Sequence, residues 1–395
     1  MEQIVTLTSF QFRFSRPLLL SALLTLAMVI TAWQKNSATL LALAVPVSLL
    51  VYLLYFSIGT EAVAQRLHDW CGSSVARYLA LPLGLVVLLY LYAGLGGEDV
   101  LRSNSWPIPL LFCLPVLFYF FALRNATTIT WKDAVGALLC LLPYAYRNYP
   151  FNSELPLGGG GIENLYLTLA LIVAVYALTV VRRLPGVGFM PDFSWTTLGT
   201  ALKWWAIIFV IVLAVGLPGG LIRWEGFEPI TPALLIAGLG LFLRTLFGTA
   251  LPEELIFRGL ILNLLQQRIN QTGNWRRYLY GSLLLLPLAG LAGYTIEAKA
   301  QWFPLLCATL LLGWTFWLIR KAPAQAADHT AQLIISTLFG LVHYHIHSTL
   351  FIGLAMLAGW AYAQVYRKTG SVFMSALTHT LVNTGPPLFG LLLVR

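Results

Sequence analysis

The stretch WWAIIFVIVLAVGLPGGLI, residues 204–222, contains no charged side chain. The hydrocarbon core of a bilayer is about 30 Å thick, and a helix of about 20 apolar residues crosses it. Three further runs, 17–33, 79–96 and 164–181, are equally free of charge. Their apolar residues are continuous, whereas the strands of a membrane β-barrel would alternate apolar and polar residues. The sequence therefore predicts membrane-spanning helices.

The composition of the whole chain agrees with this interpretation. Of its 395 residues, 58% are hydrophobic and only 10% are charged, whereas about a quarter of the residues of a soluble domain are charged. The formal net charge is +9, but the basic residues are spread between the apolar runs rather than gathered on one face, so no nucleic-acid partner is predicted. The four cysteines lie far apart without a CxxC spacing and are expected to pack in the core.

We predict an all-α, polytopic transmembrane helix bundle of about 13 spans, within a range of about 12 to 14. The expected spans are residues 17–33, 38–57, 79–96, 107–123, 134–148, 164–181, 204–222, 231–267, 278–294, 303–319, 329–347, 349–366 and 371–394.

The distribution of Lys and Arg between these spans predicts their orientation. With this span count, each connecting segment on the side of the N-terminus has at least two basic residues, and each segment on the other side has at most one. The positive-inside rule then predicts a cytoplasmic N-terminus. Arg13 and Arg16 directly precede the first span, which is expected to remain as an anchor rather than to be cleaved. In a prokaryote the protein would lie in the plasma or inner membrane.

Ionisable residues inside the predicted spans are concentrated in the C-terminal half. We divide the chain into residues 1–200, an N-terminal helical region of unknown role, and residues 201–395, which would contain any chemistry. Within the second region only Glu253 and Glu254 are carboxylates well inside a span. A charge at the bilayer centre costs at least about 2.5 to 3.5 kcal/mol on insertion scales, so this pair requires partners or a function.

The two carboxylates are expected to have different roles. Arg258 follows Glu254 at i+4, the favourable order for an ion pair on a helix. Glu253 has Phe257 at that position and no such partner, so it is our candidate general base. Pro252 removes a backbone hydrogen bond and is expected to kink or open the helix beside the pair.

Two histidines on other spans complete the candidate site. His343 follows Phe339 at i+4, and His379 is followed by Asn383 at i+4, so each pair shares one helical face. From the predicted orientations, both histidines can reach the depth of Glu253. The i, i+4 spacing of His343 and His347 could also hold a metal, although HExxH is absent and we favour neither His347 nor His345 as a ligand.

Arg244 lies on roughly the face of Arg258, and it could help to neutralise the carboxylates. For this residue a structural role is favoured over a catalytic one.

The motifs Glu253-Glu254-x-x-x-Arg258, Phe339-x-x-x-His343 and His379-x-x-x-Asn383, in this order, resemble the signature of the CAAX-processing and bacteriocin-processing (CPBP, or Abi) family of intramembrane proteases. The resemblance covers about residues 229–395. It implies a glutamic-type endopeptidase that cuts a membrane-associated or lipid-anchored protein or peptide within the lipid bilayer.

The resemblance also implies a role for each motif residue. Glu253 and His343 would activate a water molecule, and Glu254 and Arg258 would orient the site. His379 and Asn383 would stabilise the oxyanion. No cofactor is required in this interpretation. The alternative is a divalent metal such as zinc held by Glu253, His343 and His379, because one Glu and two His match a catalytic zinc site.

One departure from the family pattern is the long separation of Arg258 and His343, which predicts an extra helix pair near residues 278–319. Two other functions stay open. Intramembrane acids and histidines also relay protons in transporters, and a family member without activity could act as an immunity or binding protein. The sequence does not indicate the substrate, whether the substrate is prenylated, or the oligomeric state.

Overall fold

The structure is a computed structural model, and it describes residues 2–33, 37–97, 99, 105–146, 154–155, 163–187, 194–226, 229, 231–296, 300–388 and 390–393. The chain forms two compact units. Unit 1 comprises residues 1–127, 131–190 and 230–252, and unit 2 comprises residues 128–130, 191–229 and 253–395. These units are defined by packing and divide the chain at other residues than 200. The predicted domain boundary at residue 200 stays a prediction.

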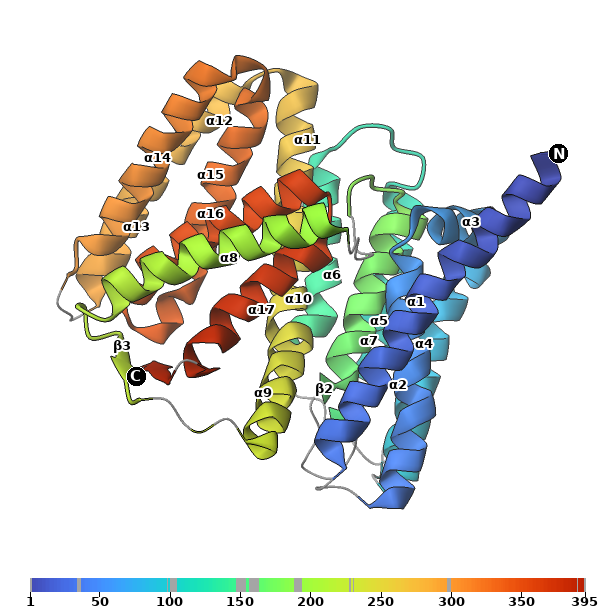
Figure 1. The fold of residues 1–395 in the computed structure, drawn as a ribbon. Helices are drawn as coiled ribbons and strands as arrows, with labels where there is room; N and C mark the ends of the chain where they lie inside the picture. The colour runs from blue at the N-terminus through green and yellow to red at the C-terminus, as the bar shows by residue number, and fades with distance from the viewer. Residues whose placement is uncertain are drawn as a thin grey trace. The chain divides into compact units, whose positions relative to one another are not determined.

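The helices of unit 1 follow the apolar runs of the sequence (Figure 1). They are α1 (Glu2–Ala32), α2 (Ala38–Ile58), α3 (Glu61–Cys71), α4 (Val75–Leu95), α5 (Pro107–Ala122), α6 (Trp131–Ala145), α7 (Leu165–Tyr176), the π-helical η1 (Ala177–Val181), α9 (Pro232–Thr245) and the π-helical η2 (Leu246–Ala250). Two short strands, β1 (Glu154–Leu155) and β2 (Glu163–Asn164), pair antiparallel.

The core of unit 1 is built around α7. Nearly every residue of this helix is buried, and it packs against α2, α4, α5 and α6; Figure 1 shows it in light green among them. A helix that is apolar on all sides is stable only when other helices surround it. Beside it, Arg182 donates from Nε to Asp133 Oδ1 at 2.6 Å and from Nη1 to the carbonyl of Ala126 at 2.7 Å. Both residues of this buried ion pair therefore have a hydrogen-bond partner.

Unit 2 contains the candidate motifs. Its elements are α8 (Trp195–Gly216), β3 (Ile222–Trp224), the π-helical η3 (Leu255–Leu262), α11 (Asn263–Thr272), α12 (Trp275–Ser282), α13 (Leu285–Thr295), α14 (Phe303–Lys321), the 3-10 helix η4 (Pro323–Gln325), α15 (Ala326–Leu341), the 3-10 helix η5 (Val342–Ile346), α16 (Thr349–Thr369), α17 (Val372–Leu388) and β4 (Leu391–Leu393). The short α10 (Leu251–Glu254) joins the two units.

The central helix of unit 2 is α16. It packs against α8, α14, α15 and α17, and α8 crosses it in Figure 1. Bonds from α8 to α17 hold these outer helices together: Trp205 donates from Nε1 to the carbonyl of Leu381 at 3.1 Å, and Thr378 donates to the carbonyl of Ala201 at 3.4 Å. Antiparallel pairing of β3 with β4 ties the segment after α8 to the segment after α17.

The prediction of an all-α membrane bundle is confirmed. Within the described residues, seven helices are long and apolar enough to cross a membrane, and the runs 16–32, 107–122 and 165–181 form shorter apolar helices. Large apolar side chains such as Leu19, Leu91 and Leu284 are exposed, as expected where lipid rather than water surrounds the protein. The protein is an integral membrane protein, while the exact number of spans and the cytoplasmic N-terminus stay predictions.

Three details of the predicted helices are wrong. Helix α15 ends at Leu341 rather than at residue 347, and a 3-10 helix follows it. Helix α17 ends at Leu388, so the last predicted span to residue 394 ends in the strand β4 instead. Residues 61–71, expected in a connecting segment, form the amphipathic helix α3.

The close approach of α15 and α16 depends on Gly340, and substitution of this residue is our first prediction. A Cβ at this position would lie 2.6 Å from the carbonyl oxygen of Ile352 and 2.9 Å from the backbone nitrogen of Met356. Because backbone atoms cannot move aside cheaply, Gly340→Ala is expected to lower the free energy of unfolding by about 1 to 3 kcal/mol.

Thermal unfolding of the purified protein in detergent measures this effect. Gly313→Ala in α14 is the matched control, because nothing lies within 4 Å of a Cβ there. Equal unfolding temperatures for the two variants would show that the approach of α15 and α16 is not limited by Gly340.

Candidate active site

The helix that carries both candidate carboxylates is not regular. Pro252 lies in the single α-helical turn of α10, which is flanked by the π-helical segments η2 and η3. π-helical turns in otherwise α-helical segments often occur at functional sites. The prediction that the helix opens near Pro252 is confirmed by these wider turns.

Glu254 is fully buried and is held by three side chains. Its Oε1 accepts from Arg258 Nη1 and from His379 Nδ1, each at 3.0 Å. Its Oε2 accepts from Ser375 Oγ at 2.6 Å. The predicted ion pair of Glu254 and Arg258 is thus confirmed, and the same carboxylate also joins α17 to η3.

Arg258 is equally buried and has further contacts on α15 and α16. Its Nη2 donates to the carbonyl of Gly359 at 2.8 Å, and its guanidinium lies 4.5 Å from the ring centroid of Phe339. Gly359 is required at this contact, because a Cβ there would lie 3.0 Å from Phe339 Cδ1. A buried cation of this kind is stable because it is paired, hydrogen-bonded and stacked on an aromatic face.

Glu253 is in a different environment, although it is adjacent in sequence. It is only partly buried, and its Oε2 is an inaccessible oxygen with no hydrogen-bond partner among the described residues. Glu253 interacts electrostatically with His343 and with Arg258. Of the two carboxylates, Glu253 is therefore the one that can accept a proton without losing an existing hydrogen bond.

His343 lies in η5, immediately after the end of α15. Its Nδ1 is 2.7 Å from the carbonyl oxygen of Phe339, and the two rings meet edge to face at 4.9 Å. Because a carbonyl oxygen can only accept, Nδ1 carries the proton in this contact. In the neutral imidazole Nε2 then has the free lone pair, which is the form needed to accept a proton.

The i, i+4 spacing of His343 and His347, which we do not favour as a metal site, does not place the two side chains on one helical face, since the 3-10 helix η5 replaces the predicted α-helix between them. His347 has a left-handed backbone (φ 54°) and is exposed. His345 is exposed too, and its Nδ1 contacts the carbonyl of Val342 at 3.0 Å. Neither residue joins the cluster around Glu254. Arg244 is exposed on α9 in unit 1, and its predicted neutralising role stays untested.

His379 is buried in unit 2 and its orientation is fixed. Its Nδ1 contacts Glu254, and its ring stacks on Tyr362 with centroids 4.6 Å apart and planes inclined by 17°. Asn383, one turn later on α17, is exposed and makes no hydrogen bond within the described part of the chain. The structure thus brings Glu254, Arg258 and His379 together but not Asn383, whose role stays a prediction.

Sequence reasoning missed two residues of this cluster, Ser375 and Tyr362. The Ser375 hydroxyl lies 2.6 Å from Glu254 Oε2 and 2.9 Å from the carbonyl oxygen of Tyr362, so its single proton serves both acceptors, with the shorter contact to Glu254. Tyr362 supports the ring of His379, and Phe339 contacts the rings of both. Ser375 lies four residues before His379 on one helical face, so this spacing could have identified it. Tyr362 had no such signal, because no motif marks α16.

The donor geometry can be compared with a metal site. In the described part of the chain, no three His, Cys, Asp or Glu side chains gather closely enough to hold a metal ion. Of the three donors considered, His379 already directs Nδ1 to Glu254, and Glu253 and His343 alone are too few for a catalytic zinc site. This arrangement does not fit the zinc alternative, and we derive no step through a metal.

The chain was compared with known proteins. A family model described as "Rce1-like: Type II CAAX prenyl endopeptidase Rce1-like" matches residues 203–329 and 318–385. These segments run from within α8 to within α17, and they contain every residue of the cluster. No curated protein and no solved structure matches the chain. The first matched segment includes residues 278–319, so the proposed extra helix pair stays a prediction.

Proposed function

Residues 203–385 of this integral membrane protein belong to the CPBP family of CAAX-type intramembrane proteases, and from this premise we propose a specific reaction. The chain hydrolyses a peptide bond near the terminus of a membrane-associated or lipid-anchored protein, with a water molecule activated by Glu253 and His343. The observation that supports this assignment best is the contrast between Glu254, which has three partners, and Glu253, whose Oε2 has none among the described residues.

Proton transfer is the first task in this reaction. Glu253, aided by the free Nε2 of His343, takes a proton from water as the oxygen attacks the peptide carbonyl. The same proton is later delivered to the leaving amine. A positioned base of this type accelerates a reaction by about 10² to 10⁴. The carbonyl of Phe339 keeps His343 in the tautomer that this step requires.

Stabilisation of the tetrahedral oxyanion is the second task, and we assign it to His379. Since Glu254 accepts from Nδ1, His379 Nε2 donates a hydrogen bond only when the ring is protonated. Arg258 and Ser375 orient Glu254 and do not contact substrate in this scheme. Asn383 is exposed one turn beyond His379, and we assign it to substrate binding.

The decisive experiment compares protein termini in cells. Membrane and secreted proteins are analysed from cells that carry the wild-type chain, Glu253→Ala or Glu225→Ala. Glu225 is the matched control because it is an exposed glutamate paired with Arg223, outside the site. Termini present with wild type and Glu225→Ala but absent with Glu253→Ala would establish proteolysis and identify the substrate. Identical termini in all three, at equal protein levels, would favour transport or a non-catalytic role.

A metal-free mechanism is a separate proposal, supported by the donor geometry described above. Activity of the purified protein is expected to be unchanged, within about twofold, after dialysis against EDTA or 1,10-phenanthroline. A loss of more than about tenfold that zinc restores would instead favour a metal held by Glu253 and His343. Because a zinc site contributes several kcal/mol to transition-state stabilisation, the two outcomes are well separated.

A further inference from the structure

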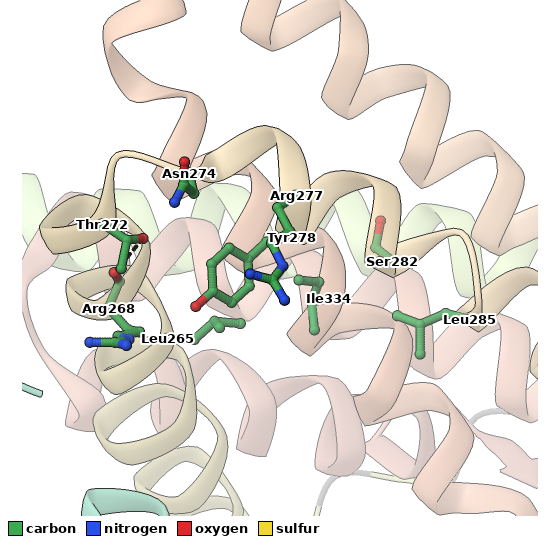
Figure 2. Close-up of a pocket in the computed structure, with 10 residues that line it drawn as sticks. Leu265, Arg268, Thr272, Asn274, Arg277, Tyr278, Ser282, Leu285 and Ile334 are labelled. Carbon is green, nitrogen blue, oxygen red and sulfur yellow. Dashed lines mark hydrogen bonds between the residues drawn. The ribbon is translucent and has the colours of Figure 1, made fainter. Parts of the chain in front are cut away.

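A cavity of about 670 Å³ lies in unit 2, away from the cluster around Glu254. It is formed where α11 ends and α12 begins, and Figure 2 shows its lining. The polar part of the lining comprises Arg268, Thr272, Asn274, Arg277, Tyr278 and Ser282, and the apolar part comprises Leu265, Leu285 and Ile334. In Figure 2 the ring of Tyr278 lies between the side chains of the two arginines.

The positive charge of this cavity is not neutralised by any acidic residue that the structure describes. Arg268 donates from Nη1 to the carbonyl of Ile129 at 3.1 Å, which leaves its other N–H groups available. No ion pair of Arg268 or Arg277 with a described acidic residue is present. Asp328 on α15 accepts from Gln266 at 2.7 Å. Both guanidinium groups are therefore free to bind an anion.

Additional donors surround the two arginines. Asn274 directly precedes α12, and its side chain does not cap the helix. The first backbone N–H groups of α12 therefore have no side-chain cap. Helix N-termini favour anions. Guanidinium, amide and phenol donors together match the several acceptor oxygens of a phosphate group.

The position of the cavity indicates the source of that phosphate. It lies between two helical segments that are long and apolar enough to span the membrane, residues 232–272 and 275–295. Next to the cavity, the turn between α12 and α13 exposes Leu283 and Leu284, and α13 exposes Leu288. A free phosphate ion requires neither an apolar floor nor a cavity of this size, whereas a phospholipid has a glycerol group and acyl chains that would contact both.

We propose that this cavity binds the headgroup of an anionic glycerophospholipid, with Arg268 and Arg277 contacting its phosphate. Basic pockets between transmembrane helices are a known mode of lipid recognition. The apolar lining contacts the glycerol and the first acyl carbons. The site is independent of the proposed proteolysis, since none of its residues belongs to the cluster around Glu254.

Lipid titration followed by native mass spectrometry tests this proposal. The full-length protein, delipidated in detergent, is titrated with phosphatidylglycerol and, in parallel, with phosphatidylcholine. Tight binding of the anionic lipid alone is expected. Loss of a charge-assisted hydrogen bond typically costs 1.5 to 3 kcal/mol, so Arg277→Gln should weaken phosphatidylglycerol binding about tenfold, and Arg268→Gln/Arg277→Gln about a hundredfold.

Arg276→Gln is the matched control. Arg276 is adjacent in sequence and exposed, but it stacks on Trp275 at 5.4 Å and does not line the cavity. This variant is expected to bind phosphatidylglycerol as wild type does. Of the two arginines, Arg268 has the hydrogen bond to the carbonyl of Ile129, so its replacement is the change that could disturb folding. The single variant Arg277→Gln therefore keeps the test informative if the double variant misfolds.

Two kinds of result with the variants and competitors would overturn the proposal, and a third comes from the comparison of lipids. The first is wild-type affinity for phosphatidylglycerol in folded Arg277→Gln, or an equal loss in Arg276→Gln. The second is competition by inorganic phosphate or glycerol phosphate at concentrations as low as those of the lipid, which would assign the cavity to a soluble phosphate compound. Equal binding of phosphatidylcholine and phosphatidylglycerol would also exclude selection by charge.

Discussion

Glu253→Gln is expected to reduce kcat for peptide cleavage by about 10³-fold while the protein stays folded. The amide has nearly the shape of the carboxylate but cannot accept a proton at neutral pH. Because Glu253 Oε2 has no hydrogen-bond partner among the described residues, the substitution breaks no contact of that oxygen. We therefore expect a loss of rate with little change in KM or unfolding temperature.

Kinetics of the purified protein in nanodiscs measure this effect, with the substrate identified from the cellular experiment. Glu225→Gln, an exposed glutamate outside the site, is the control and should keep full activity. If Glu253→Gln retained more than about a tenth of the wild-type kcat, Glu253 would not be the general base.

Glu254→Gln is expected to have the largest effect on stability. The wild-type carboxylate accepts from Arg258, His379 and Ser375 in a fully buried position. A neutral amide has one acceptor oxygen, so Arg258 would stay buried without its counter-charge. Breaking a buried ion pair by removing one partner typically costs about 3 to 5 kcal/mol. A substantial fall in unfolding temperature should accompany loss of activity.

A double variant distinguishes the loss of charge pairing from a general packing defect. Glu254→Gln/Arg258→Met removes both charges and keeps approximately the volume of both side chains. Replacement of a whole buried ion pair by neutral groups is often close to neutral for stability. The double variant should therefore unfold at a higher temperature than Glu254→Gln. If the single variant were as stable as wild type, Glu254 would not be the residue that holds Arg258.

Some features of the fold and of the site could be predicted from the sequence because they depend on short-range rules. Apolar length predicts helices such as α8 and α16, since a membrane helix satisfies its own backbone hydrogen bonds. The spacing of Glu254 and Arg258 predicts their ion pair because i, i+4 residues are neighbours on one helix. The separate environment of Glu253 follows from the same periodicity.

Other features depend on contacts between helices and could not be predicted. Gly340 lies inside the last turn of α15 rather than after it, and no Pro follows before His343, so the sequence around His343 is read as a continuous helix. The positions of Tyr362 and Gly359 near Arg258 follow from how α16 packs against η3 and α15, which no local pattern encodes. The ion pair of Asp133 and Arg182 was missed for the same reason, because its partners are far apart in sequence.

The three partners of Glu254 also have a consequence for biosynthesis. Ser375 and His379 lie on α17, C-terminal to every other element of the cluster. During translation, Glu253, Glu254 and Arg258 enter the membrane before those partners have been synthesised. In the proposed mechanism the nascent chain therefore has carboxylates without the imidazole that would stabilise the oxyanion, and it would be inactive until α17 has inserted. Under that mechanism, the order of the motifs along the chain would prevent proteolysis by an incompletely synthesised protein.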